Sequence, residues 1–322
     1  MNKCRIKFVD FSSDSVPSKI RHALDLAGIE YELSDNPDYI FCSVFGHEAL
    51  NYNCVRIFWT GENCVPDFNL YDYAIGFHYL DFGDRYIRMP LFYFYSEDYS
   101  KALNKHKLDV EKVWKRTGIC NFVYSNADAA MERQKFFDLI SKKVSVDSGG
   151  RYLNNVGGPV ENKFEFQSRY RFSIAFENSS APGYTTEKIL QAFAAGTIPI
   201  YWGDPRIANH FNEKSFINCH AYQSFEQVIE EVERVNNDKS LFGQYINEPI
   251  WNDNSTDEFP DDPMKLLVPF FLKVFLLNKD NCLVRNTGSW GRKYEIEQSN
   301  LYLKTACSDK HNFIKSMKNW IK

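Results

Sequence analysis

A glutamate and a lysine stand side by side near the start of a helix-like run in the stretch GYTTEKILQAFAAGTIPIYWG, residues 183–203. Thr185 or Thr186 can cap this helix, which places Glu187 and Lys188 in its first turn. A helix N-terminus attracts phosphate through its free N–H groups and its dipole, and a lysine adds a positive charge. A carboxylate can accept hydrogen bonds from both hydroxyls of a ribose. The pair therefore suits a nucleotide diphosphate, although a solvated first turn, with glutamate favoured by the helix dipole, fits the same positions.

Two further charged residues stand where chemistry could use them. Glu62 follows the apolar run of the segment RIFWTGEN, and a carboxylate displayed at the end of a strand can serve as a general base. Spacing alone favours an ordinary turn acid over this role. Arg151, in the glycine-rich stretch DSGGRYLNN, could reach a pyrophosphate, but a solvated loop arginine has the same sequence signature.

Strand-like and helix-like runs alternate along the chain, which favours parallel sheets with crossover helices. In the first half the strand-like runs are CRIKFVDF, DYIFCSV, VRIFWTGEN, YDYAIGF and RYIRMPLFYF. The pattern stops over residues 142–158, which contain two Gly-Gly pairs, and resumes with RFSIAFEN, TIPIYW and SFINCHA. We therefore predict an α/β protein with two Rossmann-like domains facing a central cleft. The predicted domains are residues 1–143 and 144–285, followed by a tail over residues 286–322.

Composition narrows the class of protein. A chain of 322 residues is long enough for two domains. A net charge of −4 and a pI near 6.0 argue against a nucleic-acid-binding protein. The eight cysteines form no Cys-x-x-Cys pair, so we expect free thiols in a reducing cytoplasm. The N-terminus does not read as a signal peptide, and no run approaches the ~20 apolar residues of a membrane span.

Two sets of motifs together resemble one family. The first is FEN followed by GYTTEKILQAFAAGTIPIYWGDP, and the second is FWTGENCVPDFNLYDYAIGF followed by DRYIRMPLFY. They resemble the α1,3-fucosyltransferases, inverting GDP-fucose enzymes of the GT-B fold, and the short bacterial members above all. The resemblance is densest over residues 56–94 and 146–221. It implies that the N-terminal half binds the acceptor and the C-terminal half binds GDP-fucose.

The resemblance also implies roles for individual residues. Glu62, in TGEN, corresponds to the general base that is proposed for the family, and Glu177 is a rival candidate for the same role. The donor-binding residues that it implies are the diphosphate contacts Arg151 and Lys188, the ribose ligand Glu187, and Glu177, Asn178 and Tyr184, which line the donor site.

The predicted reaction is the inverting transfer of L-fucose from GDP-β-L-fucose to the 3-hydroxyl of N-acetylglucosamine or glucose. The expected acceptors are N-acetyllactosamine or lactose, which would give Lewis x-type glycans. GDP-fucose is a co-substrate, and no cofactor is expected. Since the chain lacks the Asp-x-Asp motif of many metal-dependent glycosyltransferases, no metal is expected either. Two alternatives stay open, namely an α1,4 or mixed regiospecificity and a sugar-binding protein of this fold without turnover.

The C-terminal stretch DKHNFIKSMKNWIK, residues 309–322, predicts a basic amphipathic helix. Such a helix can rest on an anionic membrane surface or pack on the N-terminal domain. The expected location of the protein is the cytoplasm. If the helix rests on the membrane, the protein would also make peripheral contact with the inner membrane.

Overall fold

The computed structural model describes residues 3–252, 262–277 and 279–303. It consists of two compact units. Unit 1 comprises the chain up to Gly76, Leu80–Arg88 and the chain from Met264 onward, and unit 2 comprises Phe77–Tyr79 and Met89–Pro263. Each unit is an α/β structure around one parallel sheet, as the alternating sequence pattern predicts.

Unit 1 contains a six-stranded parallel sheet in the order β2-β1-β3-β4-β5-β6. The strands are β1 Cys4–Val9, β2 Tyr31–Leu33, β3 Tyr39–Cys42, β4 Val55–Trp59, β5 Tyr73–Gly76 and β6 Tyr86–Arg88. Every residue of β3, β4 and β5 is buried. This burial explains why these strands read as continuous apolar runs rather than as an alternating pattern.

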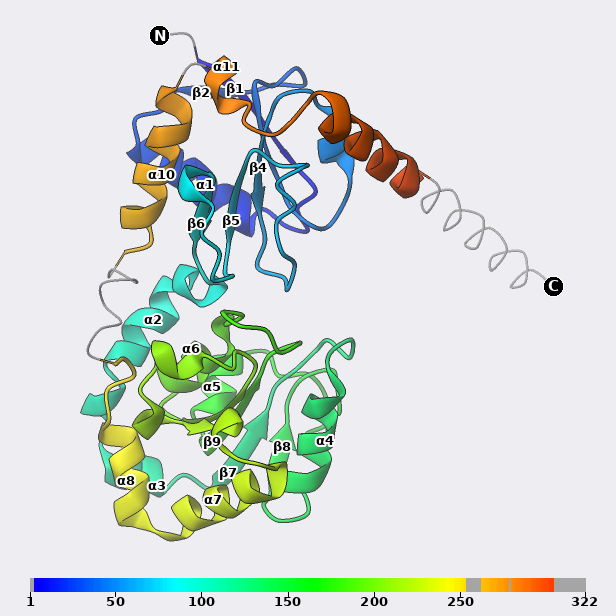
Figure 1. Cartoon of the computed structure of the whole chain (residues 1–322). Coiled ribbons are helices and arrows are strands. Elements are labelled where there is room, and N and C mark those ends of the chain that lie inside the picture. The colour runs from blue at the N-terminus through cyan, green and yellow to red at the C-terminus, as the bar shows by residue number, and fades with distance from the viewer. Residues whose placement is uncertain (1–2, 253–261, 278, 304–322) are drawn as a thin grey trace, which may run out of the picture. The chain divides into compact units, whose positions relative to one another are not determined.

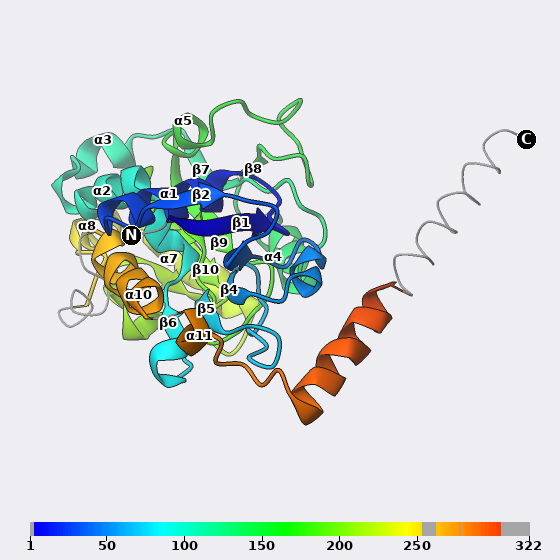
Figure 2. The same ribbon diagram turned by 90° about the horizontal axis from the view of Figure 1, so that it is seen from above.

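The C-terminal part of the chain returns to unit 1. Helix α10, Met264–Leu276, contacts α1, Ser15–Leu26, and Figures 1 and 2 show the two helices side by side. The Phe275 ring lies 4.4 Å from the ring of Tyr39 on β3. Helix α11, Lys279–Cys282, follows, and residues 289–303 form a further helix.

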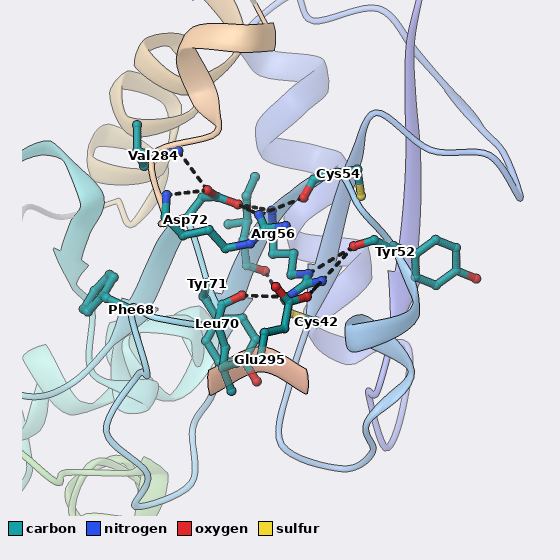
Figure 3. Close-up of polar contacts among 12 residues, drawn as sticks. Cys42, Tyr52, Cys54, Arg56, Phe68, Leu70, Tyr71, Asp72, Val284 and Glu295 are labelled. Carbon is teal, nitrogen blue, oxygen red and sulfur yellow. Dashed lines mark hydrogen bonds and ion pairs between the residues drawn. The ribbon is translucent and has the colours of Figure 1, made fainter. Parts of the chain in front are cut away.

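A cluster of buried charges fastens this C-terminal part to the sheet of unit 1 (Figure 3). Asp72 is fully buried, forms an ion pair with Arg285, and accepts hydrogen bonds from the backbone N–H groups of Val284 and Arg285 at 2.9 Å each. Arg56 on β4 forms an ion pair with Glu295 at 2.5 Å. We call Arg56, Asp72, Arg285 and Glu295 the core charge cluster.

Unit 2 contains a five-stranded parallel sheet in the order β11-β10-β9-β7-β8. Its strands are β7 Gly118–Phe122, β8 Val146–Ser148, β9 Tyr170–Phe176, β10 Ile198–Trp202 and β11 Ile217–Asn218. The described helices of this unit are α2 Ser96–Leu103, α3 Val110–Trp114, α4 Met131–Ile140, α5 Lys163–Gln167, α6 Glu187–Ala194, α7 Phe225–Asn237 and α8 Lys239–Asn247.

Both units also contain short 3-10 helices. In unit 1 they occupy Glu48–Asn51 and Gly83–Arg85. In unit 2 they occupy Leu91–Phe94, Lys105–Lys107, Ile207–Asn209, Glu213–Ser215 and Cys219–Ala221.

The units divide the chain elsewhere than at the predicted boundary near residue 144. That position lies inside unit 2, between α4 and β8. The reason is that β7 pairs with both β8 and β9, so residues 118–122 belong to the second sheet. The predicted second domain reaches residue 285, whereas unit 1 includes the chain from Met264 onward, where α10 contacts α1.

The helix predicted over residues 309–322 lies outside the described residues. Within the described part, no helix combines the length and the apolar character that crossing a bilayer requires. The described cysteines are all free thiols, and Cys307 lies outside this part.

Candidate functional site

The predicted donor-binding residues meet at the carboxyl edge of the sheet of unit 2. Because all strands of this sheet are parallel, their carboxyl ends lie at one edge, where open α/β sheets bind ligands. Glu177 and Asn178 follow the last residue of β9, and Arg151 lies in the loop after β8. Helix α6 begins at the same edge with Glu187 and Lys188.

Helix α6 begins and ends as its sequence predicts. Thr186 has the extended backbone of an N-cap residue, although its side chain makes no capping hydrogen bond to the helix. Gly196 follows the helix with φ at 67°, in the left-handed region that glycine occupies without strain. Ile189, Leu190 and Phe193 are fully buried, so the apolar face holds the first turn against the sheet.

The first turn of α6 is capped from another segment of the chain. The Glu177 carboxylate is fully buried and accepts hydrogen bonds from the Thr186 N–H at 2.7 Å and from the Thr186 hydroxyl at 2.6 Å. It thereby satisfies an N–H group that a helix N-terminus leaves open. Gly203 makes room for it, because a Cβ at this position would lie 2.3 Å from Glu177 Cγ.

Lys188 completes this group of charges. Its Nζ lies 2.7 Å from the Thr186 hydroxyl oxygen, 3.0 Å from the Glu177 carboxylate and 3.6 Å from that of Glu187. These contacts hold the ammonium group in place, and the Lys188 side chain as a whole is 12% exposed. We call Glu177, Thr186, Glu187 and Lys188 the edge charge cluster.

The electrostatics of the edge charge cluster keep Lys188 positive. Burial by itself would lower the pKa of Lys188, but the carboxylates of Glu177 and Glu187 outweigh it and raise this pKa above its ordinary value. For Glu187, burial raises the pKa, and the charges of Lys188 and Lys163 more than compensate, so the pKa lies below its ordinary value. Complete burial raises the pKa of Glu177. A charged lysine at a helix N-terminus is a group that binds a phosphate oxygen.

The loop that carries Arg151 is fixed by close packing. A Cβ on Gly150 would lie 1.8 Å from the backbone oxygen of Tyr124, so only glycine allows the loop to approach the end of β7. The Tyr152 N–H donates to this same oxygen at 2.9 Å. The Arg151 side chain is exposed and makes no hydrogen bond or ion pair with the residues that the structure describes. It is therefore available to an anion.

Asn178 is held by a residue that the sequence interpretation missed. Its side-chain oxygen accepts a hydrogen bond at 2.6 Å from Arg133 Nη2, on α4, and its backbone oxygen accepts one at 2.7 Å from the Ala130 N–H. A signal was present in the sequence, because residues 133, 136, 137 and 140 have the spacing of one helix face. Phe136, Phe137 and Ile140 make that face apolar, and Arg133 interrupts it.

Tyr184 belongs to the same region but is buried. It is 2% exposed, and the Phe77 ring lies 4.8 Å from its own ring. The Tyr201 hydroxyl donates to its backbone oxygen at 3.4 Å. Tyr184 therefore stabilises the loop between β9 and α6, and little of its surface can reach a ligand in this structure.

Glu62 lies in unit 1, at the carboxyl end of β4, as the segment RIFWTGEN predicts. Its N–H donates to the Thr60 hydroxyl oxygen at 2.9 Å, and its backbone oxygen accepts from the Cys64 N–H at 2.7 Å. The side chain is exposed, and its carboxylate makes no polar contact with the described residues. These contacts fix the turn and leave the carboxylate accessible.

No group of three or more His, Cys, Asp or Glu side chains suited to holding a metal ion occurs in residues 3–252, 262–277 and 279–303.

Two family models match the chain. The N-terminal domain model of alpha-(1,3)-fucosyltransferase FucT matches residues 6–95. The model of the C-terminal part of glycosyltransferase family 10 (fucosyltransferase) matches residues 113–259. The two matches fall on different halves of the chain and point to the same family.

Similar proteins agree with these matches. The alpha-(1,3)-fucosyltransferase FucT of Helicobacter pylori is 36% identical over 247 residues, which cover 65% of this chain and 52% of the relative. Alpha-(1,3)-fucosyltransferase B of Drosophila melanogaster is 28% identical over 193 residues, which cover 52% of this chain and 42% of the relative. The chain therefore spans about half the length of these curated relatives, or less.

Solved structures match over a larger share. A crystal structure of alpha1,3-fucosyltransferase with GDP-fucose has a TM-score of 0.70 and 30% identity, and the match covers 86% of this chain and 91% of that chain. A second crystal structure of alpha1,3-fucosyltransferase has a TM-score of 0.72 and 30% identity, with coverage of 86% and 90%.

Proposed function

The chain belongs to the fucosyltransferase family, and from this premise we propose that it transfers L-fucose from GDP-β-L-fucose to a 3-hydroxyl of N-acetylglucosamine or glucose, with inversion at the fucose C1. The observation that carries the proposal is the edge charge cluster. It presents a charged, partly exposed lysine at a helix N-terminus, at the ligand-binding edge of a parallel sheet.

In the proposed donor complex, positive groups of unit 2 surround the diphosphate. Lys188 and the N-terminus of α6 contact phosphate oxygens, and the exposed guanidinium of Arg151 contacts them from the loop after β8. Glu187 accepts hydrogen bonds from the ribose hydroxyls. Because GDP leaves as an anion, these groups stabilise the negative charge that develops on the leaving group.

The proposed chemical step is one displacement. The acceptor hydroxyl oxygen forms a bond to the fucose C1 while the bond from C1 to the phosphate oxygen breaks, and GDP leaves with the electron pair. The proton of the hydroxyl passes to the Glu62 carboxylate, which is exposed and without a partner among the described residues. We expect an oxocarbenium-like transition state, by analogy with glycoside hydrolysis.

The contacts of Glu177 favour Glu62 over Glu177 as the base. Both carboxylate oxygens of Glu177 already accept hydrogen bonds, from the Thr186 N–H and hydroxyl and from Lys188. Its side chain is fully buried, whereas a general base must reach the proton of the acceptor hydroxyl. We assign Glu177 the role of holding Lys188 and the start of α6.

The decisive experiment is a panel of GDP-sugars tested against lactose, N-acetyllactosamine and its β1,3 isomer, with the product linkage read by NMR. We expect GDP-fucose to be the donor and an α1,3 linkage to form on lactose and N-acetyllactosamine. An α1,4 linkage on the β1,3 isomer would replace the proposed regiospecificity. Absence of both GDP release and product would favour a sugar-binding protein.

We also expect the reaction to be independent of metal ions. EDTA should therefore leave most of the activity intact. A complete loss of activity that Mn²⁺ restores would contradict metal independence.

A further inference from the structure

We infer that Arg133 is a positioning residue: it holds the side-chain amide of Asn178 so that the NH₂ group, and not the oxygen, faces the donor site. The inference rests on the proposed function for the identity of the ligand. It adds a residue from α4 to the site, and it specifies that the group recognised by Asn178 is a hydrogen-bond acceptor of the GDP-sugar.

Arg133 is held in a single position. Its side chain is buried at 1% exposure, and the guanidinium lies 4.2 Å above the centre of the Tyr124 ring. Nη2 donates to Asn178 Oδ1 at 2.6 Å and to the Phe176 backbone oxygen at 3.3 Å, and Nη1 lies 3.4 Å from the Asn126 backbone oxygen. All of these partners are neutral acceptors or a π-face, and no carboxylate of the described residues forms an ion pair with Arg133.

Tyr124 in turn is fixed to β9. Its hydroxyl donates to the Ile174 backbone oxygen at 2.8 Å and accepts from the Phe176 N–H at 2.6 Å. The ring that supports the guanidinium is therefore bound to the same strand that leads into Asn178. A lysine could not reproduce this arrangement, because only a planar guanidinium can stack on the ring and donate to several oxygens at once.

The polarity of the contact decides the orientation of the amide. A guanidinium can only donate, so the atom of Asn178 that faces Arg133 must be the carbonyl oxygen. The NH₂ group then points away from Arg133, and it makes no hydrogen bond with any residue that the structure describes. The side chain is half-buried, so this donor is accessible. A ligand atom that pairs with it has to be an acceptor, such as a phosphate or hydroxyl oxygen.

The test is Asn178→Asp, with GDP as the probe in calorimetry and GDP-fucose in kinetics. The new carboxylate keeps an oxygen for Arg133 and forms an ion pair with it, so the thermal midpoint should equal or exceed that of the wild type. The second oxygen replaces the NH₂ donor and repels the nucleotide. We expect the Kd for GDP or the KM for GDP-fucose to rise about tenfold or more, the scale for a lost hydrogen bond to a charged group. If both constants stay at the wild-type values, the inference fails.

The chain offers a matched control in the same unit. Arg171 lies 4.2 Å from the Trp114 ring, and its Nη1 donates to Asn236 Oδ1 at 3.1 Å. Arg171 is the second residue of β9, so this pair lies at the amino edge of the sheet, away from the candidate site. Asn236→Asp should keep the wild-type affinity for GDP. An equal loss of affinity in Asn236→Asp and Asn178→Asp would overturn the inference.

Arg133→Met tests the arginine itself. In the folded fraction of this variant the Asn178 amide can rotate, so GDP binding should weaken. Arg133→Lys can still donate a hydrogen bond to Asn178, so this variant should bind GDP more tightly than Arg133→Met does. A folded Arg133→Met protein with wild-type affinity would overturn the inference. If Arg133→Met does not fold, the two aspartate variants decide the question. A wild-type protein that does not bind GDP at all would contradict the proposed function, which separates the two failures.

Discussion

Each unit buries ion pairs beside its parallel sheet, but the two clusters differ in what surrounds their charges. In the core charge cluster of unit 1, the side chains of Asp72 and Arg285 are fully buried, those of Arg56 and Glu295 are 1% and 7% exposed, and most of their polar atoms pair with one another or with backbone groups. In the edge charge cluster of unit 2, Glu177 is equally buried, but Lys188 and Glu187 are 12% and 21% exposed.

The difference separates two uses of a buried charge. In unit 1 the charges join distant parts of the chain, because Asp72 and Arg285 are 213 residues apart. A cluster whose charges pair with one another has little left to offer a ligand. In unit 2 one carboxylate is buried to position a lysine that stays partly exposed. The expected consequences are loss of stability from the first cluster and loss of ligand affinity from the second.

The largest expected effect is that of Asp72→Ala. It leaves Arg285 buried without its partner, which costs about 3–5 kcal/mol in the free energy of unfolding. The measurement is urea denaturation of both proteins. Arg234→Ala serves as control, because Arg234 is 61% exposed and its pair with Glu231 should contribute less than about 1 kcal/mol. A loss below about 1 kcal/mol for Asp72→Ala would contradict the structural role of the cluster.

Glu62→Gln should show the opposite pattern within unit 1. Its carboxylate is exposed and unpaired among the described residues, so the thermal midpoint should not change. Turnover should fall at least ~100-fold, the usual scale for the loss of a general base. Glu30→Gln is a matched control, because Glu30 is also exposed but precedes β2 at the amino edge of the sheet. Near-normal turnover of Glu62→Gln would exclude Glu62 as the base.

Lys188→Ala should weaken GDP binding by roughly 1.5–3 kcal/mol, the range for a hydrogen bond to a charged group. It should also lower stability, because Glu177 is left buried without its ammonium partner. Adding Glu177→Gln removes the buried charge, so the double variant should regain stability without regaining GDP affinity, as calorimetry and denaturation can measure. If affinity returns together with stability, Lys188 acts on the fold and not on the ligand.

Arg151→Ala and Glu187→Ala should each weaken GDP binding too, through the diphosphate and the ribose. Arg151 is exposed, so its loss should leave the free energy of unfolding within about 0.5 kcal/mol of the wild type. Unchanged GDP affinity in both variants and in Lys188→Ala would remove the support for the assigned donor site.

The smallest expected effect concerns His220, next to the edge of unit 2. Its Nε2 lies 3.2 Å from the Gly203 nitrogen and accepts its N–H, which requires a neutral ring. Burial lowers the pKa of His220 below 6.5, although the negative charge of Asp204 opposes this shift. Its contribution to stability is therefore complete above pH 6.5 and is lost as the pH falls through the lower pKa of the folded state.

Denaturation between pH 7 and 5 should reveal this dependence, with a slope of at most about 1.4 kcal/mol per pH unit for one proton. His220→Gln keeps an acceptor for the Gly203 N–H but cannot take up a proton, so its stability should change less with pH than that of the wild type. Parallel curves for the two proteins would show that His220 does not titrate in this range.

Local features of the chain were readable from the sequence. The strand runs ending at Trp59 and Phe176 place Glu62 and Glu177 at strand ends, and the caps and apolar face of α6 place Glu187 and Lys188 in its first turn. These properties depend on residues within one or two turns or one strand, so a pattern of neighbours suffices to predict them. The motifs over residues 56–94 and 146–221 added the family, which the comparisons confirmed.

Long-range contacts were decided only by the tertiary structure. The sequence did not indicate that β7 would pair with β9 or that α10 would return to unit 1, and it did not show that Arg133 would meet Asn178, 45 residues away. It likewise offered Glu177 as a rival base, and the hydrogen bonds of its buried carboxylate to Thr186 and Lys188 are the reason that we propose a supporting role for it instead. The physical reason is that the exposure and the partners of a charged side chain depend on which segments the fold brings together, and a linear pattern does not contain that information.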